Sequence, residues 1–196
     1  MVDFKIRFLG TASAVPTKER ALSCLAINYE NTIAIFDCGE GGQKSIMEAG
    51  LGLNKDCSVF VTHMHGDHVI GLLGLLQTMA MNRRDRQLRV FGPKGILEFI
   101  MMNQRILNFG LTFDVLVKEV RRGLVFDENN SKFRVFAERS EHSTNSFSWV
   151  IWRKTQKVVN VETPAKPRPS RIRATHLDIW RRRHFLEYIL EKRAYL

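Results

Sequence analysis

The residues with the clearest chemical potential in this sequence are three histidines and one aspartate that lie within six consecutive positions. They form the run His63-Met64-His65-Gly66-Asp67-His68. Imidazole nitrogens and a carboxylate are ligands that suit Zn²⁺ and related cations. A His-rich tract with only weak metal affinity is the alternative. The spacing, with a glycine that permits a turn, favours a metal site whose candidate ligands are His63, His65, Asp67 and His68.

Two regular elements are expected to hold this loop. Residues 58–62 form a short apolar stretch that predicts a buried strand, and residues 69–81 form an apolar run whose length favours a helix. The loop would then lie between a strand end and a helix N-terminus, so that both of its ends are anchored.

The rest of the chain alternates between predicted strands and helices. Glu30-Asn31 separates two strands and predicts a two-residue hairpin. Arg83 to Arg86 reads as a charged surface connection, and Met79, Met81, Met101 and Met102 are expected to pack in the core or between helices. The mixed order indicates an α/β layered domain, with strands over 4–9, 23–29, 32–37, 88–91, 111–120, 132–137 and 146–153, and helices over 43–49 and from Gly92-Pro93 to about 107.

Length and composition bound the class of protein. At 196 residues with 44% hydrophobic content, a single domain with a sizeable core is expected. No apolar stretch is long enough to span a membrane, and the first residues lack a secretory pattern. Cys24, Cys38 and Cys57 are odd in number and contain no C-x-x-C pair. These features predict a cytoplasmic protein without disulfides.

The charge is concentrated at the C-terminal end. Residues 153–196 carry 12 Lys and Arg against 4 Asp and Glu, in a chain whose net charge is +10. The predicted organisation is a core over 1–156, a basic, proline-rich arm over 157–175 and a helix over 176–196. A basic segment of this kind suits RNA or DNA, but a solvated tail without a partner is an equal alternative.

Several motifs together resemble ribonuclease Z, a zinc endonuclease family of the metallo-β-lactamase superfamily that matures the 3′ ends of precursor tRNAs. The resemblance covers about residues 4–152. It rests on six motifs in chain order: Phe8-Leu9-Gly10-Thr11, Phe36-Asp37-Cys38-Gly39-Glu40-Gly41, the His-Met-His-Gly-Asp-His run, Gly71-Leu72-Leu73-Gly74, Gly92-Pro93 and His142-Ser143-Thr144-Asn145-Ser146.

The resemblance implies the N-terminal portion of an αββα sandwich with a dinuclear zinc site. By position, His63, His65 and His142 resemble the ligands of one metal, and Asp67 and His68 resemble ligands of the second. Asp67 also resembles the residue that accepts a proton from the attacking water, so it is the candidate catalytic residue. Asp37 resembles an acidic residue that supports the metal loop without binding zinc. Without the resemblance, His142 is an ordinary polar loop residue.

The sequence departs from the family pattern after residue 156. The family's bridging aspartate and last histidine ligand have no match, and the basic tail does not match the family. Either the tail rebuilds these ligands, with His176, Asp178 and His184 as candidates, or the reading frame is broken or truncated. The chain is then expected to hold two zinc ions, one or none. Exposed apolar sheet surface would favour a homodimer.

Two functions follow as expectations. The first is a zinc-dependent endoribonuclease that removes the 3′ trailer of precursor tRNA. The second is a truncated, catalytically incompetent remnant that at most binds RNA through its basic arm. The metal run alone would also permit a thioester or lactam hydrolase, which the other motifs disfavour.

Overall fold

A computed structural model of the chain describes residues 4–127 and 133–153. The predicted arm over 157–175, the predicted helix over 176–196 and the proposed boundary at residue 156 all lie outside the described residues. The candidate replacement ligands His176, Asp178 and His184 lie outside them as well. None of the helices that are described is long and apolar enough to cross a membrane.

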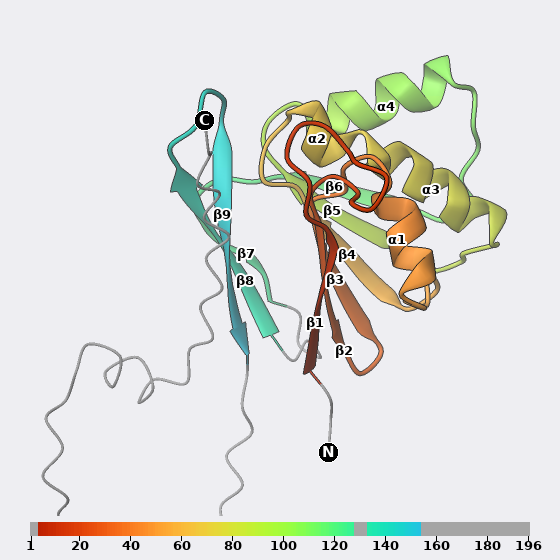
Figure 1. The fold of residues 1–196 in the computed structure, drawn as a ribbon, viewed down its shortest axis with the longest axis horizontal. Helices are drawn as coiled ribbons and strands as arrows, with labels where there is room; N and C mark the ends of the chain where they lie inside the picture. Colours follow the sequence, from red (N-terminus) through yellow and green to blue (C-terminus); the bar gives the residue numbers. More distant parts are fainter. Residues whose placement is uncertain (1–3, 128–132, 154–196) are drawn as a thin grey trace, which may run out of the picture.

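A six-stranded sheet forms the centre of the molecule (Figure 1). Its first three strands pair antiparallel, and the remaining pairs are parallel. The strands follow one another in chain order: β1 (Phe4–Gly10), β2 (Cys24–Tyr29), β3 (Thr32–Phe36), β4 (Asp56–Phe60), β5 (Leu88–Gly92) and β6 (Val115–Glu119). Because parallel neighbours need crossover connections, helices interrupt this half of the chain.

A second, three-stranded antiparallel sheet lies on one face of the central sheet, and helices lie on the other (Figure 1). The small sheet contains β7 (Gly123–Phe126), β8 (Phe133–Ser140) and β9 (Ser146–Arg153). The helices are α1 (Gly42–Glu48), α2 (Gly66–Val69), α3 (Gly71–Met81) and α4 (Ile96–Ile106). The described residues therefore form helix, sheet and sheet layers, which are three of the four layers of the expected αββα sandwich.

The two interfaces between the layers have different cores. The helices cover the central sheet with aliphatic side chains such as Leu72, Leu75 and Leu76, all fully buried. Aromatic rings fill the space between the two sheets, where Phe60 contacts the rings of Phe36, Phe91, Phe126 and Trp149. Strand β8 alternates buried and partly exposed residues, which is the pattern of a strand with one face in a core.

Most element predictions are confirmed, and the exceptions are two boundaries and one short strand. The hairpin forms around Glu30-Asn31, with Tyr29 opposite Thr32. The helix predicted from residue 69 is two helices, because α2 already begins at Gly66 and a separate α3 begins at Gly71. The strand predicted over 111–120 begins only at Val115. Strand β7 was not predicted, since it is four residues long with its Leu124 exposed.

The prediction that residues 83–86 form only a surface connection is wrong for Arg84. This side chain is 1% exposed, and its guanidinium donates hydrogen bonds to the carbonyl oxygens of Leu53, Lys55 and Gln87. Its Cζ also lies 5.5 Å from the centre of the Phe113 ring. The buried cation therefore ties α3 to the residues before β4 and β5.

The packing predicted for four methionines is confirmed only for Met79, which is buried. Met81, Met101 and Met102 were expected to pack in the core or between helices, and all three are at least half exposed.

Candidate metal centre

The metal loop leaves β4 at Phe60 and enters α2 at Gly66. Its start is fixed to the neighbouring strand, because the Val61 amide donates to the carbonyl of Phe91 at 2.7 Å. The turn that follows β3 lies against the start of α3, just after the metal loop. A Cβ atom added at Gly71 would lie 2.0 Å from the carbonyl oxygen of Gly39. The glycines of this turn and of α3 therefore let two backbones meet directly behind the loop.

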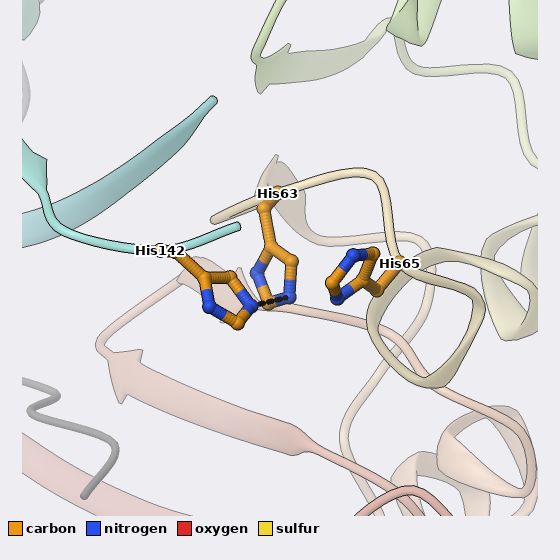
Figure 2. Close-up of side chains that lie close together, drawn as sticks. All are labelled: His63, His65 and His142. Carbon is orange, nitrogen blue, oxygen red and sulfur yellow. Dashed lines mark hydrogen bonds between the residues drawn. The ribbon is translucent and has the colours of Figure 1, made fainter. Parts of the chain in front are cut away.

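Three histidines point toward one another at this position (Figure 2). The Nε2 atoms of His63 and His142 lie 3.1 Å apart, although 79 positions separate the residues in the sequence. The ring of His65 has its centre 4.7 Å from that of His63 and 4.9 Å from that of His142. One nitrogen from each ring lies within 4.8 Å of the others. His63 is buried, whereas His65 and His142 are exposed.

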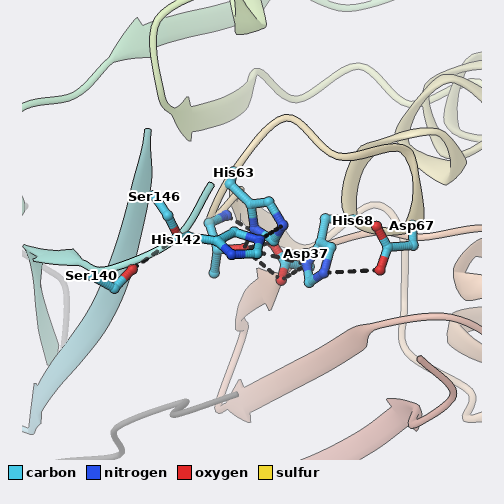
Figure 3. Close-up of polar contacts among 8 residues, drawn as sticks. Asp37, His63, Asp67, His68, Ser140, His142 and Ser146 are labelled. Atoms are coloured by element: carbon cyan, nitrogen blue, oxygen red, sulfur yellow. Dashed lines mark hydrogen bonds and ion pairs between the residues drawn. The ribbon is translucent and has the colours of Figure 1, made fainter. Parts of the chain in front are cut away.

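The turn between β8 and β9 carries His142 to this site. The amide of Phe147 donates to the carbonyl oxygen of Thr62 at 3.0 Å, which joins β9 to the metal loop. Within the turn, the hydroxyls of Ser140 and Ser146 lie 2.9 Å apart (Figure 3). The three-stranded sheet thus contributes a side chain to a loop that belongs to the central sheet.

A second group of donors lies beside the first and shares a residue with it. His63, Asp67 and His68 also place ligand atoms within 4.8 Å of one another, and Nε2 of His68 lies 3.3 Å from Oδ2 of Asp67. Since His63 belongs to both groups, the described residues offer three separate donors to one cation and only Asp67 and His68 in addition for a second.

Asp37 supports this arrangement from beneath (Figure 3). Its carboxylate accepts hydrogen bonds from the Thr62 amide at 2.7 Å, from the Thr62 hydroxyl at 2.9 Å and from Nδ1 of His68 at 2.6 Å. The aspartate is 3% exposed, and its φ of 57° lies in the left-handed region that Asp and Asn tolerate better than most residues.

These hydrogen bonds assign the protons on two imidazole rings. His68 donates a proton from Nδ1 to Asp37 and turns its Nε2 toward Asp67. The Thr62 hydroxyl donates its proton to Asp37. Its oxygen lies 2.9 Å from Nδ1 of His63 and therefore accepts a hydrogen bond from that ring. In the neutral ring of His63, Nε2 is then unprotonated and presents a lone pair, as metal ligation requires.

The electrostatics of the site favour the same neutral form. Burial, more than the nearby His68, His142 and His65, lowers the pKa of His63 to about 3. Asp67 acts in the opposite direction with a smaller effect. A histidine with this pKa carries no proton on its free nitrogen at neutral pH, so a cation can bind without first displacing one.

The donor set fits zinc. Tetrahedral ligands about 2.0–2.1 Å from Zn²⁺ lie roughly 3.4 Å from each other, and the 3.1 Å between Nε2 of His63 and Nε2 of His142 is close to that separation. Neutral imidazoles next to a carboxylate are typical zinc donors. The residues that could hold the metal are His63, His65 and His142, with Asp67 and His68 beside them.

The structure brings together all five candidate ligands predicted from the sequence. It also places Asp37 beside them, where its carboxylate accepts hydrogen bonds from Thr62 and His68. Sequence reasoning missed Thr62, which was treated only as the end of a strand. The available signal was the position of Thr62 immediately before His63. Its hydroxyl contacts the ring of this neighbouring candidate ligand.

Comparison with known proteins assigns relatives to the chain. The family model described as anti-Pycsar protein Apyc1 matches residues 4–187. Ribonuclease Z of Nitrosopumilus maritimus is 46% identical over 147 residues, which are 75% of this chain and 48% of that protein. Ribonuclease Z of Picrophilus torridus is 35% identical over 159 residues, or 81% of this chain and 51% of that protein. The chain spans about half the length of the curated relatives it matches.

Solved structures agree with these relatives. The crystal structure of the short form of human tRNase Z (ELAC1) matches with a TM-score of 0.70 and 30% identity, over 76% of this chain and 65% of that one. The metallo-β-lactamase fold protein YhfI from Bacillus subtilis matches with a TM-score of 0.58 and 18% identity, over 76% and 57%. The predicted fold class and the resemblance to ribonuclease Z are confirmed.

Proposed function

We propose that this chain is a zinc-dependent endoribonuclease acting on precursor tRNA. The chain belongs to the anti-Pycsar protein Apyc1 family and has the metallo-β-lactamase fold of its ribonuclease Z relatives. The reaction is hydrolysis of the phosphodiester that joins the 3′ trailer to the tRNA. The observation that carries the proposal is the convergence of His63, His65 and His142 from two different sheets on one point.

His63, His65 and His142 would hold one zinc ion, and Asp67 and His68 would contribute to a second. Bound zinc lowers the pKa of water toward about 7 and stabilises charge on phosphoryl oxygens. His63 is neutral before any metal binds, because its pKa is lowered to about 3. Hydrogen bonds to Thr62 and Asp37 orient the rings of His63 and His68. His63 therefore does not need to lose a proton when a metal binds.

Asp67 is the proposed proton acceptor in the reaction. It lies in the first turn of α2, and its Oδ2 is 3.3 Å from Nε2 of His68. The side chain is partly exposed, so its carboxylate can reach both the centre and solvent. A carboxylate placed here can take the proton of the attacking water and orient the water for in-line attack.

The substrate and setting belong to the same proposal. We propose precursor tRNA as the partner because the relatives are named ribonuclease Z and tRNase Z. Cys24, Cys38 and Cys57 are free and buried, which supports a cytoplasmic location. A homodimer and a basic arm over residues 157–175 that contacts RNA are proposed as well.

The shared position of His63 supports a second candidate function. The described residues supply three separate donors to one cation only. Two-metal hydrolysis of a phosphodiester needs two bound metal ions. A chain that keeps one zinc and lacks turnover would be an RNA-binding protein that acts through its basic arm. Such binding would weaken steeply as the salt concentration rises.

Metal content and cleavage separate the two candidates. The 196-residue protein is purified without chelator, its zinc is counted by mass spectrometry, and 3′-trailer cleavage of a precursor tRNA is followed. The enzyme proposal expects two zinc ions per chain and cleavage that is lost in Asp67→Asn and in His65→Ala. One zinc ion, or cleavage that persists in both variants, contradicts it. Lactam and thioester substrates should not be turned over.

A further inference from the structure

The two sheets differ in size, and the smaller one leaves part of the larger one uncovered. The central sheet has six strands and the small sheet has three (Figure 1). At the start of β9, the amide of Phe147 bonds to Thr62, which follows β4. At its end, the guanidinium of Arg153 lies 5.8 Å from the ring centre of Phe4 in β1 and 5.5 Å from that of Tyr29 in β2. Strand β9 therefore crosses the central sheet obliquely, and among the described residues no strand of the small sheet lies beyond it.

Phe8 lies in the area that the small sheet leaves uncovered. Because side chains alternate along a strand, Phe8 is on the same face of β1 as Phe4 and Ile6, which pack against the core between the sheets. The Phe8 side chain is 60% exposed. It lies opposite Leu25, which in turn lies opposite Phe36, and both of these residues are buried. A row of core side chains therefore ends in an exposed aromatic ring.

The outer edge of β9 is open as well. Its register with β8 is regular along the whole strand, so its backbone groups alternate in direction. The amide of Phe147 points to Thr62 and not to β8. The amides and carbonyls of Trp149 and Ile151 therefore also point away from β8. A strand edge with groups in this orientation is a template for a further strand.

The metal centre lies at one end of this edge. Its second group has only Asp67 and His68 as donors of its own, whereas a catalytic zinc ion usually has three protein ligands. Thr62 contacts β9 through Phe147, and its hydroxyl lies 3.3 Å from Nδ1 of His68. A strand paired with the start of β9 would therefore end beside the second group and can bring one more carboxylate or imidazole to it.

We propose that the outer edge of β9, together with Phe8, binds a strand of a separate polypeptide equivalent to the part of the ribonuclease Z relatives that this chain does not match. The matched part is 48% of one relative and 51% of the other, so about half of each remains. The bound strand places apolar side chains over Phe8 and one further donor beside His68. The nature of the centre rests on the function proposed above, but binding of the strand does not require turnover.

Two other occupants fit this surface less well. Strand β9 of a second copy, Ser146–Arg153, contains no His, Cys, Asp or Glu, so it adds no donor to the second group. Residues 154–196 include His176, Asp178 and His184, but the run Arg181-Arg182-Arg183 lies among them. Its positive charge opposes the approach of this segment to a cation.

Co-expression tests the proposal on the full 196-residue chain. The chain carries an affinity tag, and its partner is the part of Nitrosopumilus maritimus ribonuclease Z that it does not match. The two should purify as a one-to-one complex, and hydrogen exchange at the amides of Trp149 and Ile151 should be slower in the complex than in the chain alone. The zinc ion of the second group should bind at least about tenfold more tightly, because it gains a ligand. A complex with these properties that does not cleave precursor tRNA would overturn the proposed function and leave this proposal standing.

Substitutions at the surface give the sharper test. Phe8→Asp should weaken the complex at least about tenfold, because the added strand would bury a carboxylate, whereas Phe8→Leu should keep it. Val15→Asp, a change at a side chain that is 75% exposed in the loop after β1, is the matched control and should bind like wild type. Sedimentation velocity of each purified complex over a dilution series gives the dissociation constants, and circular dichroism of the tagged chain checks its fold.

Three results would overturn the proposal. The first is the absence of a complex, and the second is a complex in which the amides of β9 exchange as fast as in the chain alone or Phe8→Asp binds like wild type. The third is slow exchange of the Trp149 and Ile151 amides in the chain alone, which would show that residues 154–196 or a second copy already occupy the edge.

Discussion

Nδ1 of His68 lies 2.6 Å from Oδ2 of Asp37, and this pair connects the turn after β3 to the metal loop after β4. The same carboxylate accepts the Thr62 hydroxyl, which in turn lies 2.9 Å from Nδ1 of His63. One buried aspartate therefore orients the rings of two candidate ligands, His68 directly and His63 through Thr62. Asp37 follows the end of β3 and has a left-handed backbone conformation, and its carboxylate contacts Thr62, which follows β4.

Replacing Asp37 by Asn should weaken zinc binding by about 10–100-fold, the usual effect of losing a group that orients metal ligands. The amide is a weaker acceptor for the His68 and Thr62 protons, so the two rings are less firmly oriented. Asn tolerates the left-handed φ, so the backbone should keep its conformation. Competition with a chromogenic zinc chelator measures the affinity.

Glu40→Gln is the matched control for this experiment, because it removes an exposed carboxylate from the same turn. Equal zinc affinity in the wild-type protein and the Asp37 variant would show that the ligands are held without the aspartate.

The depressed pKa of His63 should make the metal-free protein less stable in acid. The unfolded histidine takes up a proton near its ordinary pKa of about 6.5, whereas the folded one does so only near 3. The unfolded state therefore binds more protons between these values, and the stabilisation present above pH 6.5 is lost as the pH falls toward 3. Between pH 7 and 5 this group should remove about 2 kcal/mol.

Urea unfolding at both pH values in the presence of a chelator measures the effect. The difference between wild type and His63→Gln isolates the contribution of this residue, because other titrating groups are common to both. A pH dependence that is identical in the two proteins would contradict the pKa shift.

His142→Ala should reduce zinc affinity by more than about 100-fold, the upper end of the effect expected for a residue that only supports a ligand. The change removes one of the three imidazole nitrogens of the first ligand group. The neighbouring change Ser143→Ala, on the same exposed turn, should leave affinity unchanged. Calorimetric titration of metal-free protein with zinc gives both values. If the two variants bind equally well, His142 is an ordinary surface residue and the first group is incomplete.

The sequence carries local information about this site much better than long-range information. The H-x-H-x-D-H run predicts its own loop, because a strand and a helix adjacent in sequence position it. No periodicity connects His142 to His63 across 79 positions; only the resemblance to a family supplied that link. The roles of Thr62 and Arg84 are not predicted either: Thr62 is only the last residue of a predicted buried strand, and Arg84 is assigned to a surface connection. The partners of Arg84 are backbone carbonyls on distant segments, which no sequence pattern reveals.

Arg84→Ala should lower the free energy of unfolding by about 3 kcal/mol, within the range for groups whose loss leaves buried partners unsatisfied. The change removes the donor from the carbonyls of Leu53, Lys55 and Gln87 and empties the space beside Phe113. Arg86→Ala, an exposed change two positions away, should stay within about 0.5 kcal/mol of wild type. Equilibrium denaturation in urea compares them, and zinc affinity should be unchanged in both, because Arg84 supports the fold and not the metal loop. Similar stabilities for the two variants would mean that water replaces the guanidinium.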